Sequence, residues 1–112
     1  MIDIPEIKDE EFQKIIAKAK KPVIAEFFTR SCIPCKRISP LLQEIRRDFP
    51  NNLTVVRLDI EKHPSVAAKH EVAAVPTVLI FINGLIWLRI VGVIAKKDLL
   101  RVIHEDLLGL KE

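Results

Sequence analysis

Apolar residues recur along this 112-residue chain with two different spacings, one typical of helices and one typical of buried strands. The helical spacing predicts helices at about 9–20, 32–49, 64–70 and 96–108. Short apolar runs predict strands at 23–28, 53–59, 77–82 and 85–91. Pro22 follows the first helix and ends it, whereas Pro40 lies inside the second helix and predicts a kink there.

The order of these elements predicts an α/β fold. Helices that connect buried strands imply crossover connections, and such connections predict a parallel core. Asn83 and Gly84 separate the last two strands and both tolerate a positive φ, so we expect an antiparallel hairpin there. The expected architecture is a central mixed β-sheet flanked by helices on both faces. The length fits a single domain over residues 1–112.

The ends of the helices carry signals of their own. Asp9 is the expected N-terminal cap of the first helix, because its carboxylate can accept a hydrogen bond from a free N–H group. Ala95 precedes the last helix and has no capping group. Gly109 suits the stop of that helix, since glycine adopts the left-handed conformation found there.

The charges of the chain are interleaved and argue against a nucleic-acid partner. The chain has 18 basic and 15 acidic residues, and hydrophobic residues make up 49%, a mix typical of a globular domain. The one short basic cluster, Lys18, Lys20 and Lys21, falls where cations favour a helix C-terminus. Aromatic residues make up only 5%, which disfavours a base-stacking surface.

The sequence predicts neither export nor a membrane partner. The N-terminus has no basic start and no long apolar run, so we do not expect a secretion signal. No apolar stretch approaches the roughly 18 residues that a membrane span needs. If the chain is full length, we expect a cytoplasmic protein. In a reducing cytosol, a close cysteine pair is more often catalytic or metal-binding than a structural staple.

The chain contains one such pair, in the segment Cys32-Ile33-Pro34-Cys35. The segment follows a predicted strand and opens a predicted helix, where free N–H groups and the helix dipole favour a thiolate at Cys32. Cys35 lies one turn further along and can attack a mixed disulfide. Pro34 removes one N–H donor near the thiolate, which favours a reductant over a strong oxidant. Ile33 adds apolar contact surface beside the nucleophile.

Two other roles for the cysteines remain open. A structural zinc site needs four ligands, but the chain has no third cysteine and its histidines lie far from the pair, so we expect no metal. The second alternative is a pair of buried, chemically inert cysteines.

With these residues in view, the chain resembles the thioredoxin family along essentially its whole length. The resemblance rests on Phe27, Cys32-x-Pro34-Cys35-Lys36, Pro40, Val75-Pro76-Thr77, Asn83-Gly84 and Gly92. It implies the thioredoxin fold and a cis bond between Val75 and Pro76. It also implies that this loop packs against the cysteine pair and binds the substrate backbone, with Gly92 approaching from the neighbouring loop. An ordinary proline at the start of a strand remains the alternative for Pro76.

The resemblance further implies a substrate-binding surface made of Ser31, Ile33, Pro34, Val75, Pro76 and Gly92. Three positions near the pair depart from the family pattern. The family usually has tryptophan where this chain has Ser31 and Phe28, and glycine where it has Ile33. These differences change the surface around Cys32, so we expect them to affect the choice of partner more than the cysteine chemistry.

Glu26 interrupts an otherwise apolar predicted strand. Burial should raise the pKa of such a carboxyl, which makes Glu26 a candidate general base for Cys35. The family usually carries a buried aspartate at this position, and a lysine where this chain has Arg57. Arginine does not give up its proton, so pairing would hold Glu26 ionised more firmly. Arg57 and Lys36 are therefore expected to tune the pKa values of the site, and a structural Glu26–Arg57 pair without catalytic duty is the alternative.

The function that the resemblance implies is a thiol–disulfide oxidoreductase that reduces disulfides in protein substrates and needs no bound cofactor. The thiolate of Cys32 attacks the substrate disulfide, and Cys35, deprotonated with help from Glu26, resolves the mixed disulfide. An upstream thioredoxin reductase, a flavin-dependent enzyme by the same resemblance, would reduce the oxidised pair. We expect a monomer.

Rival functions use the same residues differently. A disulfide isomerase or a glutathione-linked glutaredoxin would run the same chemistry, but Pro34 and the full family pattern weigh against both. A binding module is the other rival, with a surface around Ile33, Val75 and Gly92 and no need for redox activity.

Overall fold

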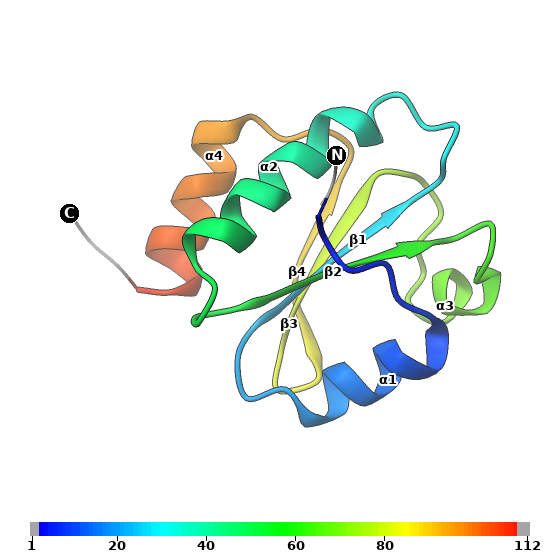
Figure 1. Ribbon diagram of the computed structural model, residues 1–112, viewed down its shortest axis with the longest axis horizontal. Helices are drawn as coiled ribbons and strands as arrows, with labels where there is room; N and C mark the ends of the chain where they lie inside the picture. Colours follow the sequence, from blue (N-terminus) through cyan, green and yellow to red (C-terminus); the bar gives the residue numbers. More distant parts are fainter. Residues whose placement is uncertain (1–2, 110–112) are drawn as a thin grey trace.

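The computed structural model of the protein describes residues 3–109, so the predicted domain range of 1–112 extends past the described part at both ends. Its elements are α1 (Asp9–Lys18), β1 (Val23–Phe28), α2 (Cys35–Asp48), β2 (Thr54–Asp59), α3 (Pro64–Lys69), β3 (Thr77–Ile82), β4 (Leu85–Val91), α4 (Lys96–Arg101) and the π-helix η1 (Val102–Leu107). Figure 1 shows α2 and α4 on one face of the sheet and α1 and α3 on the other. Within residues 3–109, no helix is both long and apolar enough to cross a membrane.

The strands form one mixed sheet in the order β2-β1-β3-β4. The prediction of a mixed sheet with helices on both faces is confirmed. The parallel core is smaller than predicted, because only β1 and β2 are parallel, whereas β3 is antiparallel to both β1 and β4. The reason lies in the α3 connection, which returns the chain to the end of the sheet where β2 finishes, so that β3 runs opposite to β2. Thr77 at the start of β3 accordingly pairs with Phe27 near the end of β1.

The apolar core forms one layer on each face of the sheet. All six residues of β1 are buried, and their side chains alternate between the two layers. Phe27 packs with Phe12 of α1 in one layer, and Ile24 packs with Ile38 of α2 in the other. The period-two geometry of a strand therefore points Glu26 toward the α2 face.

The hairpin is confirmed at the predicted residues, with φ of 52° at Asn83 and 80° at Gly84. Other boundaries differ. Lys8, not Asp9, is the N-cap of α1, and the Asp9 carboxylate instead accepts hydrogen bonds from Gln13 and Ser65. The helix ends at Lys18, two residues early.

The last helix has the predicted span but not a uniform geometry. It runs as an α-helix through Arg101 and continues as a π-helix to Leu107. Gly109 follows with φ of 67°, as expected for a helix stop. Ala95 is its N-cap and makes no side-chain capping bond.

Candidate active site

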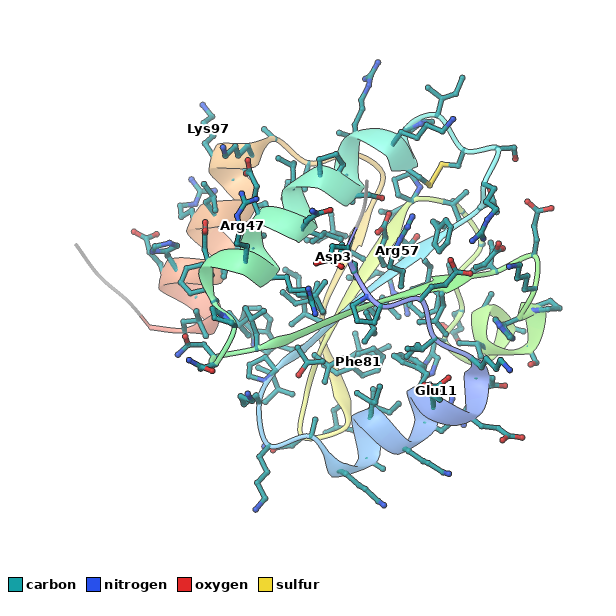
Figure 2. The ribbon with its side chains drawn as sticks, in the orientation of Figure 1. Asp3, Glu11, Arg47, Arg57, Phe81 and Lys97 are labelled. Atoms are coloured by element: carbon teal, nitrogen blue, oxygen red, sulfur yellow. A yellow bond between two sulfur atoms is a disulfide. The ribbon has the colours of Figure 1, made fainter. Side chains whose placement is uncertain are left out.

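The cysteine pair lies in the turn between β1 and α2. Cys32 and Cys35 form a disulfide, with their Cα atoms 5.3 Å apart. The helix begins at Cys35, three residues later than predicted, so Cys32 lies just outside its first turn. The backbone N–H of Cys35 donates a hydrogen bond of 3.1 Å to Sγ of Cys32. A free N–H group at the helix start thus points at Cys32, which is the interaction that stabilises a thiolate there. Figure 2 shows the S–S bond in yellow at this end of α2.

The two sulfur-bearing residues differ in exposure. Cys32 is 9% exposed and Cys35 is 1% exposed. A bulky disulfide approaching from solvent therefore reaches Cys32 first. The buried Cys35 is instead placed to react with the sulfur of Cys32.

The loop before β3 packs against the pair. The Val75–Pro76 peptide bond is cis, which confirms the conformation that the family resemblance implies. Val75 packs against the cluster formed by Phe28, Cys32 and Cys35. The N–H of Gly92 donates to the Pro76 carbonyl over 2.8 Å, so the loop after β4 is held beside this loop.

The surface around the pair is apolar and open. Ile33 is 69% exposed, and Val91 and Val93, on either side of Gly92, are 61% and 49% exposed. The two valines were not predicted from the sequence, although their position beside Gly92 was a signal. Ser31 and Pro34 are also exposed, and the residues predicted to bind substrate lie on three loops at this end of the sheet.

Glu26 is completely buried, and two polar side chains reach it. Ser39 of α2 donates from its hydroxyl to Oε2 over 2.5 Å, and Arg57 of β2 donates from Nε to Oε1 over 3.2 Å. Burial raises the pKa of the Glu26 carboxyl, and the bonds from Ser39 and Arg57 offset part of that rise. The predicted upward shift is confirmed.

Arg57 reaches Glu26 because the two residues are register partners in neighbouring strands. Its guanidinium also lies 3.9 Å from the centroid of the Phe28 ring, a cation–π distance. The guanidinium is therefore fixed between a carboxylate and an aromatic ring.

Ser39 was not predicted from the sequence as a residue of the site. Its buried hydroxyl lies 3.0 Å from the carbonyl oxygen of Cys35, four residues earlier in α2, and 3.4 Å from Nη2 of Arg57. The signal was present: Ser39 follows Ile38 on the apolar stripe of a helix, where a polar residue needs a partner.

Arg30 and Asp59 were also missed, and together they anchor the turn before Cys32. Arg30 forms ion pairs with Asp59 at the end of β2 and with Glu6 near the N-terminus. Burial alone would raise the pKa of Asp59. The backbone N–H groups of Glu61 and Lys62 and the Arg30 guanidinium outweigh burial and leave this pKa below its usual value.

A cavity of about 210 Å³ opens beside the disulfide. It is lined by Phe28, Thr29, Arg30, Cys32, Cys35, Lys36, Ser39 and Arg57. Lys36 thus lies near the pair, and its effect on the pKa values of the site stays a prediction. Among residues 3–109, no group of three or more histidine, cysteine or acidic side chains could hold a metal ion.

Comparison with known proteins gives a consistent result. The family model described as Thioredoxin matches residues 3–105. A thioredoxin of Griffithsia pacifica is 30% identical over 106 residues, which are 95% of this chain and 97% of that protein. A thioredoxin of Mycobacterium bovis is 34% identical over 99 residues, 88% of this chain and 85% of that protein. A bifunctional thioredoxin reductase/thioredoxin of Mycobacterium leprae is 38% identical over 96 residues, which are 86% of this chain but only 21% of that protein.

Proposed function

The chain belongs to the thioredoxin family and is a thiol–disulfide oxidoreductase, and on this premise we propose a role for each residue of its site. Cys32 is the attacking thiolate, Cys35 is the resolving thiol and Glu26 is the general base. The observation that carries the assignment of the two cysteines is the N–H of Cys35 aimed at Sγ of Cys32, the more exposed member of the pair.

The reaction proceeds in two exchanges. The Cys32 thiolate attacks one sulfur of a substrate disulfide, forms a mixed disulfide and releases the other substrate sulfur as a thiolate. Cys35 then loses its proton to Glu26, whose partners Ser39 and Arg57 line the same cavity as Cys35. The Cys35 thiolate attacks Sγ of Cys32, forms the Cys32–Cys35 disulfide and releases the second substrate thiolate. The substrate gains two electrons, and the pair is left oxidised.

The substrate surface is proposed to lie around the three loops at the cysteine pair. Ile33 is open to solvent next to Cys32, and Val91 and Val93 flank Gly92 on the opposite loop. The backbone at Val75 and Pro76 runs between them. An extended peptide that carries a disulfide could therefore contact apolar side chains on both sides while its sulfur meets Cys32.

A thioredoxin reductase is the proposed electron donor. The support is the bifunctional relative from Mycobacterium leprae, whose name joins a reductase to a thioredoxin. We also propose that the protein is a monomer, that it is cytoplasmic and that residues 1–112 form one domain. These three points rest on the sequence.

Reduction of insulin disulfides driven by dithiothreitol tests the proposal, with Cys32→Ser as the control. We expect rapid precipitation of the insulin B chain with the unmodified protein and the background rate with Cys32→Ser. If the folded unmodified protein reduces insulin no faster than the variant does, a general disulfide reductase activity is excluded. A binding module would then be favoured, and a double Cys32→Ser, Cys35→Ser variant should retain its partners.

A further inference from the structure

Ser39 has a single hydroxyl hydrogen and faces two acceptors. One acceptor is Oε2 of Glu26 at 2.5 Å, and the other is the carbonyl oxygen of Cys35 at 3.0 Å. Nη2 of Arg57 donates to the same oxygen over 3.4 Å. A hydroxyl can donate only one strong hydrogen bond while accepting up to two, so Ser39 must choose between its two acceptors.

The choice follows the charge on Glu26. An ionised carboxylate is the stronger acceptor, so the Ser39 hydroxyl donates to it. A protonated Glu26 carries its own O–H, which donates to the Ser39 oxygen. The Ser39 hydrogen then turns to the Cys35 carbonyl. In both states the polar atoms of Glu26 and Ser39 have partners, although these side chains are only 0% and 2% exposed.

We propose that Ser39 is a positioning residue for the second exchange, which it serves by switching its hydroxyl between Glu26 and the Cys35 carbonyl as Glu26 gains and loses the proton of Cys35. This inference rests on the proposed role of Glu26 as the base. A buried carboxyl that changes its protonation normally leaves a polar group without a partner, at a cost to proton transfer. The switch avoids that cost.

Within the described structure, no other group beside Glu26 can replace Ser39 in this switch. The side chains that hydrogen-bond to Glu26 are Arg57 from β2 and Ser39 from α2, and its register partner in β3 is Val78, which has no polar side chain. Arg57 is a donor only and cannot accept the hydrogen of a protonated carboxyl. Ser39 is therefore the one side chain beside Glu26, within residues 3–109, that can both donate to it and accept from it.

The test separates the two exchanges in one experiment. Reduced protein is mixed with a large excess of an aromatic disulfide whose thiolate absorbs strongly. Attack by Cys32 releases one aromatic thiolate, and attack by Cys35 on the mixed disulfide releases the second. The rate of each phase is measured by stopped-flow absorbance between pH 5 and 9. The variants are Ser39→Ala, Ser39→Thr, which keeps the hydroxyl, and Ser65→Ala, a matched change at an exposed serine of α3.

We expect Ser39→Ala to slow the second phase about tenfold at pH 7, since a hydrogen bond to a charged group typically has that effect. The midpoint of its pH profile should move to higher pH, while the first phase stays unchanged. Ser39→Thr should restore most of the rate, and Ser65→Ala should match the unmodified protein. Titration of the Glu26 carboxyl by carbon NMR in the oxidised protein should show the same upward displacement for Ser39→Ala.

Three results would overturn the inference. The first is an unchanged second phase in Ser39→Ala together with a slow second phase in Glu26→Gln. This result would keep Glu26 as the base and reject the role of Ser39. The second is an equal loss in Ser39→Ala and Ser39→Thr with no displacement of the pH profile, which indicates packing alone. The third is an unchanged second phase in Glu26→Gln itself, which rejects the base and the inference with it.

Discussion

Nε of Arg57 donates a hydrogen bond of 3.2 Å to Oε1 of Glu26, a side chain with no exposed surface. An ion pair of this kind favours the charged carboxylate, whereas burial opposes it. Burial prevails here, because the pKa of Glu26 lies above its usual value despite Arg57. A structural ion pair and a proton-accepting role were alternatives in the sequence analysis. The geometry makes them compatible, since a paired carboxyl with a raised pKa can still take up a proton.

Replacing Arg57 with glutamine should raise the pKa of Glu26 further, because the change removes the cation that opposes burial. The pH profile of mixed-disulfide resolution should move to higher pH, and the rate at pH 7 should fall about tenfold. The two-phase stopped-flow measurement reports both effects. Arg47→Gln is the matched control, since Arg47 is exposed near the far end of α2 (Figure 2). An unshifted profile in Arg57→Gln would show that the guanidinium does not act on Glu26.

The raised pKa of Glu26 also predicts how stability depends on pH. The folded protein binds a proton at Glu26 more tightly than the unfolded chain does, so this stabilisation is complete below pH 4.5, the ordinary pKa. It is lost as the pH rises through the folded pKa. Glu26→Gln should flatten this fall. The variant should gain about 1.4 kcal/mol at pH 8 for each unit by which folding raises the pKa.

Urea unfolding of the oxidised protein at intervals from pH 4.5 to 8.5 measures this dependence. Glu44→Gln is the control, because Glu44 lies in α2 with a side chain that is 38% exposed. Parallel stability curves for Glu26→Gln and the unmodified protein would refute the assignment of the pH dependence to Glu26.

Whether a feature of this site could be predicted from the sequence depends on how far apart along the chain the contacting residues lie. The hairpin, the burial of Glu26 and the place of the cysteines follow from local signals: turn residues, an apolar run and a strand-to-helix junction. The partnership of Glu26 with Arg57 was suggested by family resemblance, and its geometry comes from strand register, which pairs residues 31 positions apart.

Contacts that join distant segments were not predictable in the same way. Arg30 meets Asp59 only because parallel pairing brings the ends of β1 and β2 together. The late start of α2 at Cys35 was missed because the sequence around the strand-to-helix junction does not show how far the turn extends, whereas hydrogen bonding within the turn decides where the helix starts. The direction of β3 depends on where the α3 connection returns, which no local pattern records.

His70 predicts a second effect of pH on stability, of opposite sign. Its ring lies about 5.5 Å from the rings of Phe12 and Phe81, and its Nε2 has no hydrogen-bond partner among residues 3–109. Burial lowers the pKa of His70, and the nearby cations Lys69 and Arg89 lower it further. The unfolded chain therefore takes up a proton first, near pH 6.5, and stability falls as the pH drops from there through the folded pKa.

His70→Phe should remove this loss, because phenylalanine fits an aromatic site and has no nitrogen to protonate. Removing the unpaired ring nitrogen should add about 1–3 kcal/mol at pH 7.5. The gain at pH 5 should be larger, because the variant also escapes the loss of stability that protonation causes. Urea unfolding at the two pH values measures the difference. His104→Phe is the control, since His104 is exposed on η1. A gain that is equal at both pH values would reject protonation of His70 as the cause.

Ile33 should determine how tightly a protein substrate binds, without affecting the fold. Its side chain is 69% exposed beside Cys32, so Ile33→Ser removes little packing from the folded protein. It removes apolar surface that a docked substrate would bury, and a partly buried isoleucine accounts for roughly a tenfold change in affinity. We therefore expect KM for insulin to rise about tenfold, with kcat and the unfolding temperature unchanged. Leu85→Ser is the matched control, because Leu85 is 74% exposed at the opposite end of β4 from Gly92 and should leave KM unchanged. An unchanged KM in Ile33→Ser, or an equal rise in both variants, would place substrate docking elsewhere on the molecule.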